Sequence, residues 1–126
     1  MDALKPLSAL LLEDDDPLVR RSAAAALGSL RHDRAGEALS VALADRDGRV
    51  RHVAARALGE QGGELAIDAL GRALIAERVP KVRRMAAWAL SRMGDEAAFA
   101  ALDAARLDRD PAVRNIAEAT LTRAED

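Results

Sequence analysis

The sequence contains no cysteine and no tyrosine, and its only aromatic residues are Trp88 and Phe99. Without cysteine the chain has no disulfide, no thiolate zinc site and no cysteine nucleophile. A core with so few aromatic residues must be built from Ala, Leu and Val. These small side chains let backbones approach closely, which favours packing of helix on helix. The net charge of −2 provides no overall attraction for nucleic acid.

Long apolar runs are also missing. No segment approaches the roughly 20 apolar residues that a membrane-spanning helix needs. The N-terminal segment MDALKPLSALLLEDDD starts acidic, is interrupted by Pro6 and ends in carboxylates instead of a cleavage site, so we expect no signal peptide and no membrane association. Half of the residues are hydrophobic and 32% are charged, which is typical of a folded soluble chain. We expect one cytoplasmic domain, residues 1–126, and the excess of Arg over Lys indicates a bacterial or archaeal source.

What the sequence does contain is a repeat. The segment DPLVRRSAAAALG (16–28) returns as DGRVRHVAARALG (47–59), VPKVRRMAAWALS (79–91) and DPAVRNIAEATLT (110–122). Four columns share the spacing of 31 or 32 residues: Val19, Val50, Val82 and Val113; Leu27, Leu58, Leu90 and Leu121; Leu12, Leu43 and Leu74; and Leu39, Leu70 and Leu102. A period of this length over the whole chain is typical of helical repeat proteins.

Within one unit the apolar spacing is helical. Val19, Ala23 and Leu27 recur at i, i+4 and i+8. Asp16 before Pro17 has the pattern of an N-cap followed by proline at the first helical position, and Gly28 and Gly59 are interpreted as stop signals near helix ends. We expect first helices, called A, at about 17–30, 48–61, 80–93 and 111–123, second helices, called B, at about 34–44, 64–75 and 96–107, and a further B-type helix at about 3–13.

One such hairpin cannot bury its apolar face alone, whereas stacked hairpins share a continuous core. We therefore predict an all-α fold, an α-solenoid of about three to four helical hairpins. Its units are a half repeat at 1–14, repeats at about 15–45, 46–76 and 77–108, and a terminal half repeat at 109–126. Polar outer faces are expected on the first and last helices. The run from Leu10 to Leu12 departs from this, and we expect one of these leucines to face outward or to meet another chain.

The repeated D-P-x-V-R-x-x-A-A-x-A-L-G pattern and the segment GELAIDALGRAL resemble the short HEAT repeats of the phycobilisome-lyase-like (PBS lyase) class. The resemblance implies a solenoid whose B helices line a concave surface that holds partners, and it extends to bilin lyase subunits and adaptors. The chain departs from the pattern at Val79, where Asp is expected, at Arg106, where Leu is expected, and in the turns at Arg31 and Gln61. We expect the last interface between units to be less regular.

An arginine follows each valine of the first column. These arginines, and the acidic residues that recur with the same period, are Arg20, Arg51, Arg83 and Arg114, and Asp14, Asp45, Glu77 and Asp108. Equal periods place each guanidinium near carboxylates of its own or the next unit, where its planar fork can bind them. We interpret the column as a structural ladder that sets the stacking register. The alternative is a line of cations that binds phosphates.

Two surfaces are candidates for partner binding. The register of the B helices leaves small and polar residues outside the core, and these predict a concave groove formed by Glu37, Ser40, Val41, Asp68, Gly71, Arg72, Asp103 and Ala104. On the A helices, an outer apolar patch would combine Val53, Met85, Trp88 and Ile116. Tryptophan is a favoured interface anchor. The alternative is that these four side chains fill gaps between A helices.

No residue pattern predicts catalysis. HEAT-type hydroxylases that bind iron use His-Glu pairs at matched repeat positions, whereas His32 is followed by Asp33 and His52 by Val53. The serines lie in helical context, not in a strained turn. The pair Gly62-Gly63 follows a helix and is interpreted as a turn. We expect no catalytic residue, no cofactor and no metal ion.

We therefore predict a non-catalytic protein-interaction or assembly scaffold that acts through its concave B-helix surface. We expect protein partners, with association of identical chains left open, and neither a membrane nor a nucleic acid. Two alternatives remain. The resemblance implies a subunit of a bilin or chromophore lyase-type complex, which an absorbance change on mixing with bilin would reveal. The arginine column indicates, as the second alternative, nucleic-acid binding by an Arg-lined face, which a DNA gel shift at low salt would reveal.

Overall fold

The structure is a computed structural model of the chain, and it describes residues 3–30 and 32–125. These residues form eight α-helices and one short 3-10 helix, and they contain no β-strand. In chain order the elements are α1 (Leu4–Glu13), α2 (Pro17–Gly28), α3 (Asp33–Ala42), α4 (Gly48–Gln61), α5 (Gly63–Ala76), α6 (Pro80–Met93), α7 (Glu96–Leu102), η1 (Asp103–Leu107) and α8 (Pro111–Glu125). The predicted all-α class is confirmed. Arg31, one of the expected departures, lies outside the described residues.

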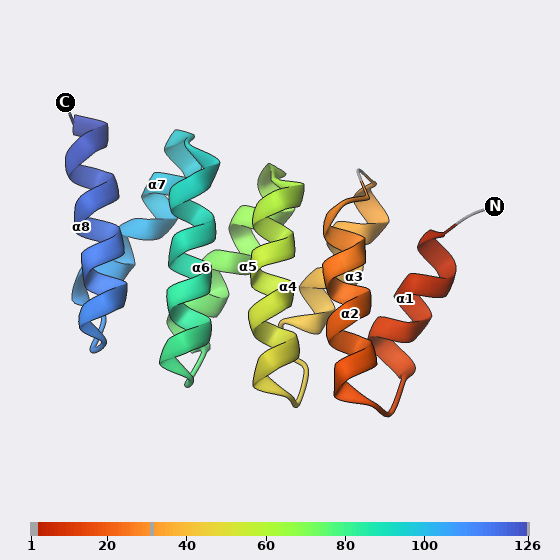
Figure 1. Cartoon of the computed structure of the whole chain (residues 1–126). Coiled ribbons are helices and arrows are strands. Elements are labelled where there is room, and N and C mark those ends of the chain that lie inside the picture. Colours follow the sequence, from red (N-terminus) through yellow and green to blue (C-terminus); the bar gives the residue numbers. More distant parts are fainter. Residues whose placement is uncertain (1–2, 31, 126) are drawn as a thin grey trace.

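The helices form two layers (Figure 1). The A helices α2, α4, α6 and α8 make one layer, and α3, α5 and α7 lie behind them (Figure 1). Each helix contacts the next one of its own layer, and α1 joins the second layer through its contact with α3. The N- and C-terminal helices therefore lie at opposite ends of the molecule (Figure 1). This stack of hairpins is the α-solenoid that the repeat predicts.

Aspartate caps begin most of the A helices. Asp16, Asp47 and Asp110 each accept a backbone N–H from the first turn of their own helix, over 2.8 to 3.2 Å. At α6 the equivalent residue is Val79, which has no side-chain acceptor. There the carboxylate of Glu77 accepts the N–H of Val79 at 3.1 Å. The change from Asp to Val therefore leaves the first turn of α6 without a side-chain cap.

The core lies between the layers and is built from the periodic columns. The leucines at the centre of each interface are fully buried, namely Leu27, Leu39, Leu58, Leu70, Leu90 and Leu102. Burial of each such side chain contributes about 1.5–3 kcal/mol. At the N-terminal end Leu11 is fully buried, whereas Leu10 and Leu12 are 40% and 46% exposed. Two of the three leucines therefore face outward where one was expected, because no described helix covers that side of α1.

Two glycines allow neighbouring A helices to approach closely. A Cβ atom on Gly28 would lie 2.9 Å from the Cβ of Ala57, and one on Gly59 would lie 2.8 Å from the Cβ of Ala89. Both distances are shorter than van der Waals contact. The interpretation of Gly59 as a stop signal was wrong, because α4 runs through it and ends at Gln61. Gly62, with φ of 72°, makes the turn instead.

The side chain of Gln61 forms hydrogen bonds to the end of the preceding A helix. Its side-chain amide Nε2 donates to the carbonyl oxygens of Leu27 and Gly28, at 2.9 and 3.3 Å, and to that of Leu30. The carbonyls of Leu27 and Gly28 belong to the last turn of α2, where the helix leaves them without intrahelical partners, and Leu30 follows that turn. The departure from the repeat pattern at Gln61 therefore supplies a C-cap from the following unit.

The last B element differs from the single helix predicted at 96–107. The α-helix ends at Leu102 and the chain continues as the 3-10 helix η1. Arg106 stands where the earlier units have Leu43 and Leu74, and its guanidinium bonds Asp103 at 3.1 Å. The final turn thus lacks the apolar side chain found at this position in the two preceding units, which accounts for the correction.

Candidate functional site

The periodic arginines bind carboxylates in the loop that leads to the next A helix. The contacts, measured from Nε to the nearer carboxylate oxygen, are Arg20 to Asp45 (2.9 Å), Arg51 to Glu77 (2.9 Å) and Arg83 to Asp108 (3.0 Å). In each pair Nη2 also donates to the carboxylate, at 3.1 to 3.2 Å, so the pairing is bidentate. These side chains are at most 17% exposed. Each pair therefore links one A helix to the loop before the next A helix.

The same guanidinium groups hold the loop in front of their own helix. Nη1 of Arg83 donates to the carbonyl oxygens of Glu77 and Arg78 at 3.1 and 3.0 Å. Equivalent carbonyl bonds recur at the other arginines of the column. Arg114 makes only these, because the described residues place no carboxylate at its Nε, and Asp14 accepts the N–H of Asp16 without an arginine partner. A phosphate-binding column would need these arginines free.

A second kind of pair lies nearer the surface. Arg84 Nε donates to Asp110 Oδ2 at 2.7 Å, and Asp110 also caps α8. This hydrogen bond lowers the pKa of Asp110 to about 2. In the same way the hydrogen bond from Arg49 lowers the pKa of Asp47. Both aspartates are therefore charged caps at neutral pH and do not serve as proton donors there.

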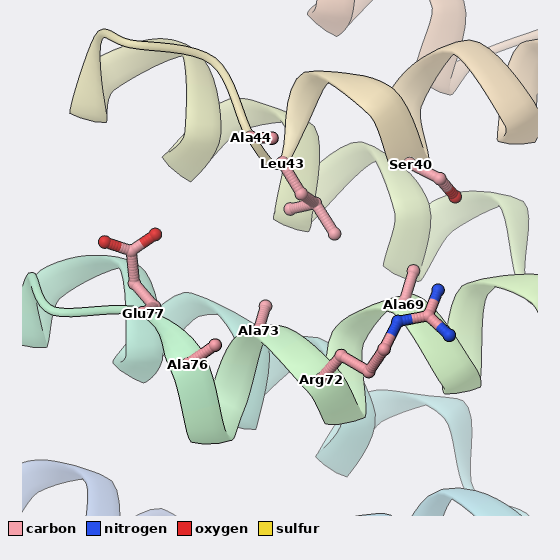
Figure 2. Close-up of a pocket in the computed structure, with 8 residues that line it drawn as sticks. All are labelled: Ser40, Leu43, Ala44, Ala69, Arg72, Ala73, Ala76 and Glu77. Carbon is pink, nitrogen blue, oxygen red and sulfur yellow. The ribbon is translucent and has the colours of Figure 1, made fainter.

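The B helices α3 and α5 enclose a shallow groove of about 250 Å³ (Figure 2). It is lined by Ser40, Leu43, Ala44, Ala69, Arg72, Ala73, Ala76 and Glu77. Figure 2 shows Leu43 extending from the α3 side towards α5, and the guanidinium of Arg72 at the same end of the groove as Ser40. Ser40 Oγ is buried without a hydrogen-bond partner. Arg72 is exposed and forms no ion pair with any described residue.

The other residues predicted for the B-helix surface lie on the same layer but are more scattered. Exposed members are Glu37, Val41, Asp68, Arg72, Asp103 and Ala104, whereas Ser40 and Gly71 are half-buried. The groove brings Ser40 and Arg72 together. Glu37 lines a different hollow, beside His32 and Gly62, and Asp103 pairs with Arg106 on η1.

Sequence reasoning missed an exposed apolar row at the C-terminal ends of the B elements. Ile75 is 77% exposed and Leu107 is 90% exposed. These two residues occupy equivalent repeat positions, with Ala44 at the same position in the preceding unit. An alignment of the repeats could have identified Ile75 and Leu107, since their repeat position is apolar in three consecutive units and lies outside every core column. Val41, 61% exposed, flanks the row on α3.

The outer patch predicted on the A layer divides into two kinds of residue. Val53, Met85 and Ile116 are half-buried and pack against the core. Trp88 is 42% exposed, and the guanidinium carbon of Arg92 lies 5.6 Å from the centre of its ring. Three of the four side chains are therefore partly covered by the core, and only the indole presents substantial surface.

The two histidines have separate surroundings. His32 Nδ1 accepts the N–H of Arg34 at 3.1 Å and so caps α3. His52 lies on α4, and its pKa is lowered by burial and by the nearby charges of Lys81 and Arg56. Among residues 3–30 and 32–125, no three His, Asp or Glu side chains gather as a metal site. No helix in this part of the chain combines the length and apolar character needed to cross a membrane.

Comparison with known families gives three overlapping matches. The model described as HEAT repeats matches residues 36–122, the one described as PBS lyase HEAT-like repeat matches residues 19–45, and the one described as HEAT repeat matches residues 3–30. No curated protein sequence matches the chain.

Solved structures share the fold. Human deoxyhypusine hydroxylase in complex with glycerol is 31% identical over 97% of this chain and 43% of that protein, with a TM-score of 0.84. An engineered protein is 23% identical over 96% of this chain and 62% of its own, with a TM-score of 0.67. Another is 24% identical over 98% and 38%, with a TM-score of 0.59. The chain thus spans less than two thirds of the length of each of these proteins.

Proposed function

The chain belongs to the HEAT-repeat family, and we propose that it is a non-catalytic module whose B layer binds a segment of a partner protein. HEAT repeats generally mediate protein interactions. The observation that carries the proposal for this chain is the α3–α5 groove, where the polar groups of Ser40 and Arg72 both lack partners. Ser40 Oγ is buried, so the group that an incoming segment can reach is the exposed guanidinium of Arg72.

The groove and its surroundings define the chemistry of the partner segment. The groove floor is made largely of alanine, so a side chain or a backbone can approach closely. Arg72 offers a guanidinium for a carboxylate, which it would bind as a fork. The B elements also carry the exposed apolar side chains of Val41, Ile75 and Leu107. The matching segment is therefore one with apolar anchors and at least one Asp or Glu.

The arginine–carboxylate ladder supports a role in presenting a rigid binding surface, and not a role in catalysis. The buried carboxylates and guanidinium groups of the A-helix loops are bound to each other, as in the Arg83–Asp108 pair. These contacts hold adjacent repeats in one register. A preorganised surface loses little conformational entropy on binding, so a modest contact area is sufficient.

The proposal is tested by comparing variants of two surfaces. Ile75→Asp/Leu107→Asp places two charges in the apolar row of the B layer. Leu18→Asp/Trp88→Asp introduces the same charges at exposed apolar positions of the A layer. Proteins captured from the source cell by the unchanged chain are identified, and the strongest is purified and its affinity measured by calorimetry. We expect the B-layer variant to bind at least tenfold more weakly and the A-layer variant to bind normally.

A third variant tests the groove itself. Arg72→Glu reverses the charge in the groove without touching the core, and we expect a loss of affinity that a matching Glu→Arg change in the partner restores. Circular dichroism confirms that each variant is folded. A partner that is lost with Leu18→Asp/Trp88→Asp and retained with the B-layer changes would contradict the proposal and place the binding surface around the indole.

A further inference from the structure

A second hollow lies in the A layer, between α2, α4 and the start of α6. It has a volume of about 340 Å³. Its apolar lining is valine, from Val53, Val79 and Val82, and its polar and charged side chains are Arg21, Asp47, Arg49, His52 and Lys81. We refer to it as the A-layer cavity. Its size lies at the lower end of the range for pockets that hold small organic molecules.

The single carboxylate of the A-layer cavity is already engaged. Asp47 Oδ1 accepts the backbone N–H of Arg49 at 2.8 Å, and its two oxygens also accept Nε and Nη2 of Arg49 at 3.1 and 2.9 Å. Arg21 and Lys81 are exposed, and neither forms a hydrogen bond or an ion pair with a described residue. The cavity therefore has two cations whose charge no neighbouring carboxylate compensates.

These two cations are distinctive because most arginines in the first two turns of the A helices are paired. The ladder arginines bind buried carboxylates, and Arg84 binds Asp110. Arg21 belongs to α2 and Lys81 to α6, so they approach the cavity from the two helices that flank α4. The chain as a whole has a net charge of −2, so this positive charge is local and does not reflect a generally basic surface.

The start of α6 contributes both an apolar and a charged side chain to this region, because Val79 and Lys81 line the cavity. The carboxylate of Glu77 accepts the N–H of Val79 at 3.1 Å, so the positive charge of the cavity comes from the side chains of Arg21 and Lys81. Together with the valine lining, this combination suits a ligand that carries negative charge on an apolar stem.

We propose that the A-layer cavity binds an organic phosphate monoester, with its apolar body on the valines and its dianionic head between Arg21 and Lys81. Two cations from separate helices match a doubly charged phosphate group better than they match a singly charged carboxylate. The site is independent of the B-layer groove, because the two share no lining residue.

His52 provides a reporter inside the cavity. The pKa of its imidazole is lowered by burial and by the charges of Lys81 and Arg56, and Arg21, Arg49 and Asp47 also line the cavity around it. A bound dianion adds negative charge next to the imidazole, so it raises the pKa of His52. His32, the other histidine of the chain, caps α3 and serves as an internal control.

The experiment follows the two imidazole signals by NMR while ligand is added to the folded chain. The probes are phenyl phosphate, inorganic phosphate and benzyl alcohol, which supply charge with an apolar ring, charge alone and the ring alone. We expect phenyl phosphate to shift the His52 signals saturably and to raise the pKa of His52, with His32 unchanged. Inorganic phosphate and benzyl alcohol are each expected to bind at least tenfold more weakly than phenyl phosphate.

The two lysines of the chain give a matched pair of variants. Lys81→Ala should weaken phenyl phosphate binding roughly tenfold, which corresponds to about 1.4 kcal/mol, whereas Lys5→Ala on α1 should leave it unchanged. Dissociation constants are compared, because Lys81→Ala by itself already changes the pKa of His52. The proposal is overturned if phenyl phosphate leaves His52 unaffected, if His32 responds equally, or if Lys5→Ala weakens binding as much as Lys81→Ala does.

Discussion

A methyl group added at Gly59 should weaken the contact between α4 and α6. The new Cβ would lie 2.8 Å from the Cβ and 3.3 Å from the Cα of Ala89. Neither atom can move without moving the backbone of α6, so the two helices must separate. Overpacking of this kind costs about 1–3 kcal/mol, whereas alanine is favoured over glycine in a helix by about 1 kcal/mol. The steric term is larger, and we expect Gly59→Ala to lower the free energy of unfolding by about 1 kcal/mol.

Gly71 provides the matched control, because it also lies inside a helix, α5, but has room for a side chain. A Cβ there would be 3.5 Å from the Cβ of Ala101, which is an ordinary van der Waals contact. Only the helix preference then acts, and Gly71→Ala should raise stability by about 0.5–1 kcal/mol. Urea unfolding followed by circular dichroism measures both variants. If Gly59→Ala is as stable as Gly71→Ala, the close approach does not limit the packing of the A helices.

Two further predictions concern the charged pairs. Arg83→Ala leaves the carboxylate of Asp108 buried without its partner and should lower the free energy of unfolding by about 3 kcal/mol. Arg114→Ala removes only hydrogen bonds to carbonyls and should lower it by about 1 kcal/mol. Equal losses in urea unfolding would show that the carboxylate pairing is not decisive. Asp110 has its pKa lowered to about 2 by the hydrogen bond from Arg84, so its charged form stabilises the fold above about pH 4 and this contribution is lost as the pH falls towards 2. The midpoint of thermal unfolding should therefore fall less steeply with acid in Asp110→Asn than in the unchanged chain, and identical slopes would contradict the pairing.

Much of the architecture could be predicted because the repeated units share one sequence pattern, so what holds for one unit is expected in the others. A valine followed by arginine at positions 19, 50, 82 and 113 indicates that each arginine meets the same surroundings. The acidic residues with the same period then predict carboxylates near each arginine, from its own or the next unit, and the structure places Asp45 2.9 Å from Arg20. Because equivalent positions of stacked repeats lie next to each other, the period predicts which residues are neighbours in space. A sequence without repeats does not allow this prediction.

The features that resisted prediction occur once and depend on contacts between units. The amide of Gln61 reaches carbonyls of the preceding unit, and no pattern within its own repeat indicates this. The split of the last B element follows from the loss of one leucine at Arg106, whose effect depends on how neighbouring helices pack. The unpartnered hydroxyl of Ser40 and the uncompensated charge of Lys81 become visible only when surrounding groups are placed in three dimensions.

Each ladder pair links an A helix only to the loop before the next A helix, and this has a consequence for how such a protein can change in length. The segment 47–78 contains one whole A helix, one whole B helix and both members of the Arg51–Glu77 pair. A tandem duplication of this segment would bring Glu77 of each copy to the arginine of the same copy, and it would place Gly59 of the first copy against Ala57 of the second. The protein could grow or shorten by a complete hairpin while every remaining junction keeps its chemistry.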